Sequence, residues 1–289
     1  MAADGYGDDL AVVTVTYSPG EVLDTFLDSL AGATTRVPKV LLADNGSTDG
    51  APERAAAARE NVEFVPTGGN LGYGGGANHA VATLSADYGW VVVANPDIEW
   101  RPGSLDTLLD AAGRWPRAGS LGPLIREPDG RVYPSARLVP SLGRGAGHAL
   151  FGKVWPGNPW SRAYRQSDAA VTERTAGWLS GSCLLLRREA FEAVGGFDAG
   201  YFMYFEDVDL GERIGRAGYD NVYVPSAEVV HLGGHATSKV SGRMLAEHHR
   251  STYRYLSGRY SGPLHAPLRL ALRAGLAARS FLQTRAART

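Results

Sequence analysis

The sequence predicts an α/β fold, and the alternation of two kinds of segment is the main evidence for it. Four short runs are dominated by apolar and β-branched residues bounded by Gly, Pro, Asn or Asp, which is typical of buried parallel strands. These runs are AVVTVTY (11–17), KVLLAD (39–44), NVEFVP (61–66) and WVVVAN (90–95). Segments with helical spacing separate them, at 21–30, 52–60 and 74–86. Strand and helix therefore alternate over roughly the first 110 residues, as in a doubly wound, Rossmann-like sheet flanked by helices.

The rest of the chain is less regular. Residues 113–175 are rich in Gly, Pro, Arg and Trp and are expected to form loops and short strands laid over the site. A further buried strand is predicted at 180–188, running into the helix REAFEAV, and β structure returns at 221–231. The tail from Arg243 onward is expected to be helical in two pieces, broken near 261–263.

Composition excludes several classes of protein. With 289 residues and 44% hydrophobic content the chain can bury a full core, which excludes intrinsic disorder. A formal net charge of −1 provides no overall field that would attract nucleic acid. Cys183 is the only cysteine, so no internal disulfide can form and the cytosol is the expected compartment. We expect neither a signal peptide nor a transmembrane helix, because the N-terminal residues are acidic and no apolar run reaches the required length.

Basic charge is concentrated at the C-terminal end. From Met244 to Thr289 there are eight arginines against the single acid Glu247, which gives 8 − 1 = +7. Such a tail suits an anionic membrane surface or a phosphate-bearing partner. The segment 265–285 mixes Leu and Arg and is interpreted as an interfacial helix, the alternative being a helix packed on the domain or on another subunit.

Polar residues follow the predicted strands where each strand ends, and ligands of doubly wound sheets bind at that edge. They are Thr16, Tyr17 and Ser18 after the first strand, Asp44 and Asn45 after the second, and Asn95 and Asp97 after the fourth. Asp44 either accepts a hydrogen bond from a nucleobase or ribose or belongs to a βα turn that caps the next helix. Asp97 either ends a strand or holds Mg²⁺ or Mn²⁺ together with diphosphate oxygens and waters.

Two further segments carry candidate ligand-binding side chains. The glycine-rich stretch GGNLGYGGGANHA (68–80) lets backbone approach a ligand before a helix N-terminus, and its candidates are Asn70, Gly72 and Asn78. It is not a P-loop, because no GK[ST] follows. His231 follows an apolar run and is either a histidine satisfied near the core or a metal ligand.

The stretch YFMYFEDVDLGER (201–213) places acids at a predicted helix start. In a helix over 205–217, Asp207 falls on the stripe that faces the core, whereas Asp209 and Arg213 form an outward i,i+4 pair. Asp207 is therefore a candidate general base with Glu206 beside it, the alternative being an acid that merely favours the helix dipole. Asp209 and Glu212 are expected to face solvent and to form salt pairs.

Six motifs, in this order and spacing, resemble the inverting family 2 glycosyltransferases with a GT-A fold. They are TVTYSPG, LLADNGSTDG, GGNLGYGGGANHA, VANPD, SGSCLLLRREAFEAVGGFD and FMYFEDVDLGER, and the resemblance covers roughly residues 11–235. The resemblance implies that Thr16, Tyr17 and Asp44 face the base and ribose of a nucleotide sugar. It also implies that Asp97 and His231 bind the metal and that Asp207 deprotonates the acceptor. Asn95 stands where the family has the first acid of its DxD motif, which leaves the metal one carboxylate there.

A closer resemblance within the family is to actinobacterial rhamnosyltransferases. LLADNGSTDG, GPLIREPDGRVYPSAR, GWLSGSCLLLRR and HHRSTYRYL carry it. It implies transfer of L-rhamnose from dTDP-L-rhamnose to N-acetylglucosaminyl-diphospho-decaprenol at the inner face of the plasma membrane, forming the arabinogalactan–peptidoglycan linker. The alternatives are another nucleotide sugar and acceptor, a nucleotidyltransferase, and a non-catalytic nucleotide-sugar or carbohydrate-binding protein.

The implied domain organisation is a catalytic domain at 1–240 and a helical, basic, membrane-associating extension at 241–289. Within the domain, donor binding is assigned to about 1–112 and acceptor binding to about 113–240. The acceptor-side candidates are Trp178, Gly181 and Ser182, and Trp155 and Trp160 are further aromatic candidates.

Overall fold

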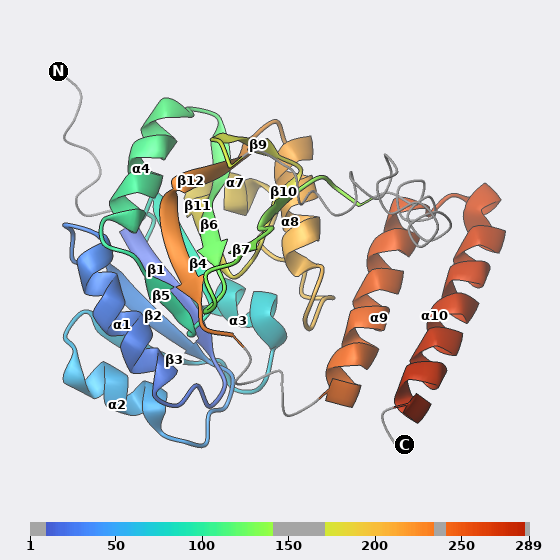
Figure 1. The fold of residues 1–289 in the computed structure, drawn as a ribbon, viewed down its shortest axis with the longest axis horizontal. Helices are drawn as coiled ribbons and strands as arrows, with labels where there is room; N and C mark the ends of the chain where they lie inside the picture. The colour runs from blue at the N-terminus through green and yellow to red at the C-terminus, as the bar shows by residue number, and fades with distance from the viewer. Residues whose placement is uncertain (1–9, 141–170, 234–240, 287–289) are drawn as a thin grey trace.

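A mixed β-sheet with helices on both faces forms the centre of the molecule (Figure 1). The computed structural model describes residues 10–140, 171–233 and 241–286, so Trp155 and Trp160 lie outside the described residues. The strands of the main sheet are β1 (Leu10–Thr16), β2 (Lys39–Asp44), β3 (Val62–Pro66), β4 (Trp90–Ala94), β5 (Ile98–Trp100), β6 (Ala118–Arg126), β7 (Val132–Tyr133), β9 (Arg174–Ala176), β11 (Cys183–Arg187) and β12 (Asp220–His231). Two short strands, β8 (Ala136–Arg137) and β10 (Trp178–Leu179), pair separately.

The first half of the chain builds the parallel part of the sheet. The order along the main path is β3-β2-β1-β4-β11-β6-β12-β5, and β1 pairs in parallel with both β2 and β4. The four strands predicted from apolar runs are confirmed, each to within one residue at either end. β11 then enters antiparallel to β4 and β6, which makes the sheet mixed.

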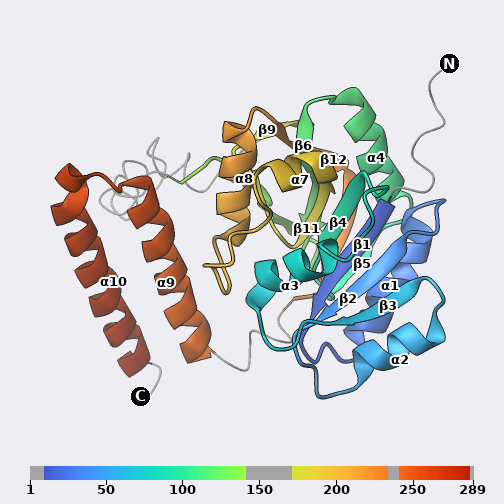
Figure 2. The ribbon, with the colours of Figure 1, turned by 180° about the vertical axis from the view of Figure 1, so that it is seen from behind.

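Two hydrophobic layers separate the sheet from its helices. Alternate residues of β1 divide between them, because successive side chains of a strand point to opposite faces. Leu10 and Val12 pack with α1, α2 and α4, whereas Ala11 and Val13 pack with α3, α7 and α8. Figure 2 shows the second face. The helices are α1 (Val22–Ala33), α2 (Ala51–Ala58), α3 (Gly72–Val81), α4 (Ser104–Arg114), α7 (Arg188–Ala193), α8 (Glu206–Arg216), α9 (Ser241–Arg259) and α10 (Ala266–Ala286).

Strand β6 corrects the expectation that residues 113–175 form only loops and short strands. It has nine residues, is almost wholly buried and lies between β11 and β12 in the middle of the sheet. The sequence AGSLGPLIR does not predict a strand, because Gly and Pro are depleted from strands. A Cβ at Gly119 would lie 2.8 Å from Tyr219 and 2.9 Å from Ile214. Close approach of the helical layer, which favours glycine here, therefore outweighs strand propensity.

The C-terminal helices stand beside the sheet rather than against it. The predicted two-piece helical tail is confirmed: α9 and α10 are joined at the 3₁₀ turn Pro263–His265. In both views α9 lies toward the domain and α10 is outermost (Figures 1 and 2). None of the described helices combines the length and the apolar character needed to cross a membrane.

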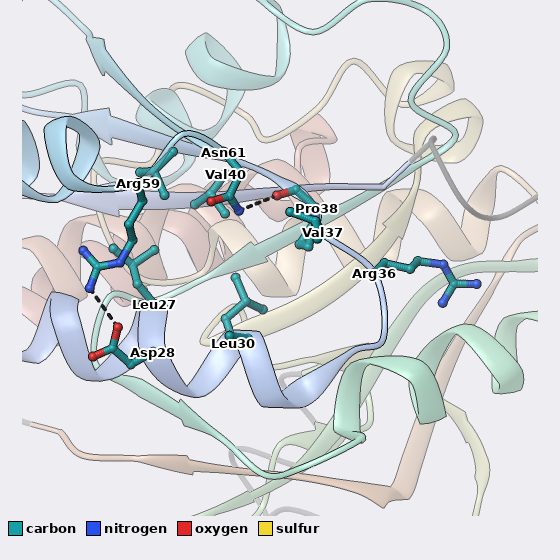
Figure 3. Close-up of a pocket in the computed structure, with 11 residues that line it drawn as sticks. Leu27, Asp28, Leu30, Arg36, Val37, Pro38, Val40, Arg59 and Asn61 are labelled. Carbon is teal, nitrogen blue, oxygen red and sulfur yellow. Dashed lines mark hydrogen bonds and ion pairs between the residues drawn. The ribbon is translucent and has the colours of Figure 1, made fainter.

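A hollow of about 350 Å³ opens between α1 and the start of β2, at the amino ends of the parallel strands (Figure 3). The Asn61 side chain donates to the Pro38 carbonyl at 2.9 Å there, and Arg59 pairs with Asp28 at 2.8 Å. None of the candidate site residues lines this hollow. The candidate site lies at the opposite, carboxyl ends of the strands.

Candidate active site

Asp97, Asn95 and His231 meet at one corner of the sheet. His231 pairs with Ile98 in the β12–β5 ladder, and the Leu232 amide donates to the Asp97 carbonyl at 2.9 Å. The His231 Nε2 atom is consequently 3.1 Å from Asp97 Oδ1 and 3.2 Å from Asn95 Nδ2. The fold brings together two side chains that are 134 residues apart in sequence.

The donor set of this corner fits a small divalent cation. The Asp97 and His231 side chains are 16% and 28% exposed, so the corner is accessible while its walls are packed. Adjacent ligands of an octahedral Mg²⁺ lie about 3 Å apart when each is about 2.1 Å from the ion, which agrees with the 3.1 Å between Oδ1 and Nε2. No cluster of three or more His, Cys, Asp or Glu side chains suited to a metal occurs in the described part of the chain. Substrate oxygens and waters would therefore complete the coordination.

A second corner holds Asp207 at the start of α8. Its Oδ2 atom accepts from the Gly181 amide at 2.9 Å, and its Oδ1 atom accepts from the Val208 amide at 2.8 Å. Burial raises the pKa of Asp207, and these two amides oppose the shift. A carboxylate with a raised pKa and a fixed orientation is suited to accepting a proton.

The first residues leading into β11 connect the two corners. Gly181 donates its amide to Asp207, and the Ser182 carbonyl accepts from the Asn95 amide at 2.9 Å. A Cβ on Gly181 would be 3.2 Å from Asp207 Cβ, so glycine leaves room for the carboxylate. The acidic corner and the metal corner thus face the same stretch of backbone.

Tyr73 is a site residue that the sequence analysis missed. Its hydroxyl donates to the Gly181 carbonyl at 2.5 Å. Burial and then the Glu206 carboxylate raise the pKa of Tyr73, with smaller contributions from Asp207 and Asp97. The sequence feature that could have identified Tyr73 is its position as an aromatic residue within the glycine-rich stretch 68–80.

Glu206, not Asp207, is the more buried acid at the start of α8. The prediction placed Asp207 on the inward stripe, but Glu206 is 8% exposed and Asp207 retains partial exposure. Tyr204 and Phe205 both have positive φ, at 67° and 68°, so α8 begins at Glu206 from a left-handed turn. That turn sets the rotation of the helix and places the Asp207 carboxylate beside the Gly181 amide.

The Glu206 carboxyl lacks a complete set of partners. Its Oε2 atom is buried without a hydrogen bond among the described residues. Burial, followed by the neighbouring Asp207 charge, raises the pKa of Glu206 to about 8. The protonated form is therefore favoured for Glu206, whereas the two backbone amides favour the charged form of Asp207.

Substitution Glu206→Gln is expected to flatten the pH dependence of stability. The folded protein keeps this proton up to about pH 8, whereas an unfolded glutamate loses it near 4.5. The free energy of unfolding should therefore fall as pH rises through that window, and a glutamine should remove this part of the slope. Urea unfolding at several pH values would measure it, with the exposed residue change Glu192→Gln as control. Parallel profiles for wild type and Glu206→Gln would contradict the assignment.

Helix α9 braces the turn that carries these acids. The Ser251 hydroxyl donates to the Met203 carbonyl at 2.8 Å, and Arg254 pairs with Asp198 at 2.8 Å. The His248 ring packs edge-on against Tyr204, with centroids 5.4 Å apart. Helix α9 is thus part of the scaffold of the turn that carries Glu206 and Asp207.

The other two acids of α8 form salt pairs, as expected, but their side chains are mostly buried, which corrects the expectation that they face solvent. Asp209 and Arg213 form the predicted i,i+4 pair at 2.7 Å, but the pair is mostly buried and Arg213 also donates to the Val194 carbonyl. Glu212 accepts from Tyr255 and Arg259 of α9. Sequence spacing alone does not reveal α9 as a partner.

At the donor end, Asp44 organises the turn after β2. Its carboxylate accepts from the Thr16 hydroxyl at 2.8 Å, from the Ser47 hydroxyl at 2.5 Å and from the Gly46 amide at 3.0 Å. Asp44 is 5% exposed. Its contacts in this structure are those of a residue in a βα turn, one of the two alternatives that the sequence left open. Ser18 accepts from the Thr48 amide at 3.0 Å.

Two donor-side candidates at this edge have side chains that remain accessible. Tyr17 is 57% exposed at the end of β1. Asn70 is exposed and accepts from the Gly72 amide at 3.1 Å. A planar ring and an amide group are thus available to a bound nucleotide or sugar.

Three other donor-side candidates hold protein backbone. Asn45 donates to the Gly72 carbonyl at 3.0 Å, and Asn78 both donates to the Phe197 carbonyl and accepts from its amide. Gly72 has φ of +75°, and a Cβ there would lie 2.2 Å from the Phe202 carbonyl oxygen. The glycine at this position allows close approach of two loops, where the sequence predicted approach of a ligand.

We expect Gly72→Ala to destabilise the fold by roughly 3 kcal/mol, combining left-handed strain with overpacking. Gly69→Ala is the matched control, because its Cβ would meet nothing within 4 Å. Thermal unfolding of both variants would measure the difference. Equal midpoints for the two variants would contradict the packing role of Gly72.

Trp178 is buried rather than presented to an acceptor. It is 9% exposed, its indole N–H donates to the Leu138 carbonyl at 3.2 Å, and it packs beneath α8 against Gly211. This placement corresponds to a core residue. Apolar shape alone could not distinguish a core tryptophan from one that stacks on a sugar.

Comparison with known proteins gives the family. Residues 11–195 match the Glycosyl transferase family 2 model, and residues 162–283 match Glycosyl transferase family group 2. The chain is 59% identical over 287 residues to N-acetylglucosaminyl-diphospho-decaprenol L-rhamnosyltransferase of Mycobacterium tuberculosis, covering 96% of this chain and 94% of that protein. It is 32% identical to rhamnosyltransferase WbbL of Escherichia coli K12, covering 66% of this chain and 72% of that one.

Solved structures agree on the fold. The mannosyltransferase PcManGT from Pyrobaculum calidifontis, in complex with GDP-Man and Mn²⁺, superposes with a TM-score of 0.62 at 16% identity, over 98% of this chain and 76% of that one. GalNAc-T7 with UDP, GalNAc and Mn²⁺ gives 0.58 at 14% identity, over 78% of this chain and 43% of that one. The mixed sheet flanked by helices is the GT-A fold predicted from the sequence. By its family model, its relatives and its fold, the chain belongs to glycosyl transferase family 2.

Proposed function

We propose that this protein transfers L-rhamnose from dTDP-L-rhamnose to N-acetylglucosaminyl-diphospho-decaprenol, with inversion at the anomeric carbon. The observation that carries the proposal is the 59% sequence identity, over nearly the whole chain, to a Mycobacterium tuberculosis enzyme that is named for this acceptor and this sugar. The geometry supports the same chemistry. A candidate base and a candidate cation site flank one stretch of backbone at Gly181–Ser182.

In this mechanism Asp207 removes the proton from the acceptor hydroxyl. Its two hydrogen bonds from backbone amides fix the carboxylate and favour its charged form, and the raised pKa of Glu206 favours the protonated form of that neighbour. Attack by the deprotonated oxygen on the face opposite the nucleotide forms the new glycosidic bond and inverts the centre. Base catalysis of this kind typically contributes 10² to 10⁴-fold.

The leaving nucleoside diphosphate carries the negative charge that develops in the reaction. Asp97 and His231 would hold Mg²⁺ or Mn²⁺, and such an ion stabilises charge on the diphosphate oxygens. The exposed Tyr17 ring and the Asn70 amide at the donor edge are available to the base and sugar. Thr16, Ser18 and Asp44 shape that edge through the hydrogen bonds between the ends of β1 and β2.

Residues 1–240 would form the catalytic domain and residues 241–289 the membrane-associating extension, bound to the inner face of the plasma membrane. Leu264, in the 3₁₀ turn before α10, is 92% exposed, Leu270 on α10 is 70% exposed, and the tail is strongly basic. Leucine inserts at the lipid boundary while arginine attracts anionic head groups.

Co-sedimentation with phosphatidylglycerol vesicles should be lost in the double variant Leu264→Glu/Leu270→Glu. Retained co-sedimentation would reject the leucines as the anchor.

The experiment that tests the reaction is a transfer assay. Purified protein would be incubated with dTDP-L-rhamnose, Mg²⁺ and a short-chain N-acetylglucosaminyl diphosphate lipid, and the products examined by mass spectrometry. A rhamnosylated lipid that disappears with EDTA is expected. Folded protein that forms no product would overturn the donor and acceptor assignment, and a panel of nucleotide sugars would then test the family's other activities. Saturable binding without any product would instead favour a non-catalytic carbohydrate-binding protein.

A further inference from the structure

Arg137, at the end of β8, carries a guanidinium group that is held rigidly in place. Its Nε atom donates to the Pro134 carbonyl at 2.7 Å. Its Cζ atom lies 5.5 Å from the centroid of the Tyr133 ring and 5.6 Å from that of Trp178. A guanidinium fixed by one hydrogen bond and two aromatic rings loses little conformational entropy when it binds a ligand.

The terminal nitrogens of Arg137 are unused. Among the described residues, Nη1 and Nη2 make no hydrogen bond, and Arg137 forms no ion pair. Neighbouring Arg174 is different, since it packs on Tyr223 and both of its terminal nitrogens donate to backbone carbonyls, of Thr175 and Ala136. Arg137 therefore keeps two parallel donors available, the arrangement that recognises phosphate in a bidentate manner.

The position of Arg137 relates it to the candidate base. Arg137 pairs with Trp178 across β8 and β10, and Trp178 packs against Gly211 of α8, the helix that starts at Glu206–Asp207. The charge of Arg137 is close enough to Asp207 to lower the pKa of that carboxyl, in opposition to burial. The guanidinium thus lies next to Trp178, which packs on α8, the helix that carries the candidate base.

Two exposed apolar residues flank the segment from Tyr133 to Arg137 in the sequence. Leu138 follows Arg137 directly and is 45% exposed, and Val132 is 42% exposed on the neighbouring strand β7. Exposed aliphatic groups beside a cation match a ligand whose phosphate is joined to a hydrocarbon chain. A free nucleotide would gain nothing from them.

We propose that Arg137 binds the diphosphate of a lipid-linked acceptor, with Leu138 and Val132 contacting the first part of the lipid chain. The proposal rests on the proposed function, in which the acceptor sugar carries its diphosphate on the same ring as the reacting hydroxyl. When that hydroxyl contacts Asp207, the phosphates must lie about one sugar ring away, on the acceptor side. Arg137 supplies the bidentate cation needed there.

The test compares Arg137→Gln and Arg137→Lys with wild type, using the short-chain N-acetylglucosaminyl diphosphate lipid as probe. Calorimetry would give its Kd, and steady-state kinetics would give separate KM values for acceptor and donor. We expect Arg137→Gln to weaken acceptor binding roughly 30-fold or more, the effect of losing one partner of a desolvated charge pair. Arg137→Lys should be intermediate, because it keeps the charge but not the planar fork. The KM for dTDP-L-rhamnose should stay unchanged.

Two controls separate a binding role from a structural one. Arg174→Gln removes a similarly stacked arginine whose donors are already used, so it should leave acceptor affinity near the wild-type value. An alkyl N-acetylglucosaminide without phosphate should bind equally to wild type and Arg137→Gln. An unchanged Kd for the diphosphate lipid in a folded Arg137→Gln protein would overturn the proposal. Wild-type protein that binds this lipid through Arg137 but transfers nothing to it would overturn the proposed function instead.

Discussion

Asp207→Asn is expected to reduce kcat by roughly 10² to 10⁴-fold, the usual contribution of a general base. The amide cannot accept the acceptor proton, although it occupies nearly the same volume. One of the two backbone amides that now donate to the carboxylate, Gly181 or Val208, would face the new NH₂ group. A lost hydrogen bond of this kind costs about 1–3 kcal/mol, so moderate destabilisation should accompany the loss of turnover.

Binding measurements separate the chemical step from damage to the fold. The Kd for the nucleoside diphosphate should be unchanged in Asp207→Asn, because this carboxylate lies away from the ends of β1 and β2. Glu192→Gln on α7 is the matched carboxylate-to-amide control, since Glu192 is exposed and, among the residues that the structure describes, its carboxylate pairs with Arg188 alone. Turnover close to wild type in a folded Asp207→Asn protein would eliminate Asp207 as the base.

Asp97→Asn is expected to abolish activity at ordinary metal concentrations and to raise the metal concentration needed for half-maximal rate by at least 10²-fold. Residues that only support a metal ligand cost about 10 to 100-fold in affinity when mutated, so loss of a direct anionic ligand should cost more. Asn95 and His231 would remain as neutral partners. Titration of chelator-treated protein with Mn²⁺ and Mg²⁺ measures the shift, and excess metal should restore part of the rate.

The control for this variant is Asp87→Asn, whose carboxylate is exposed and contacts Ser85 at 3.2 Å. His231→Ala should shift the metal requirement in the same direction as Asp97→Asn, because the two side chains lie 3.1 Å apart. An unaltered metal titration for Asp97→Asn would show that the cation, if required, binds elsewhere. Full activity of wild type in EDTA would remove the metal from the proposal.

Much of the donor half could be predicted from the sequence. The runs that became β1, β2, β3 and β4 have strong local signals, because a buried parallel strand needs continuous apolar residues regardless of its neighbours. Parallel strands also end at one edge, so the polar residues after them were expected to gather there. The pairing of Asp97 with His231 was likewise predicted, but through family resemblance rather than through local pattern.

Predictions from local sequence pattern were wrong where a contact with a segment distant in sequence determines the local structure. Strand β6 carries Gly119 because α7 and α8 approach it closely, and a glycine read in isolation argues against a strand. Gly72 was assigned to a ligand, yet the space its missing Cβ leaves is filled by the Phe202 backbone. Neither neighbour is adjacent in sequence, so neither assignment could be made from spacing.

The sequence by itself determined the α/β class, the order of the donor strands, the two-part helical tail and the presence of acids at 206 and 207. Tertiary structure decided which acid is buried, because two left-handed residues at Tyr204 and Phe205 set the rotation of α8. It also decided that α9 braces this turn and that the terminal nitrogens of Arg137 have no hydrogen-bond partner within the described part of the chain. Periodicity and turn chemistry are short-range properties that sequence records directly. Burial, helix rotation and the pairing of charges depend on which distant segments pack together.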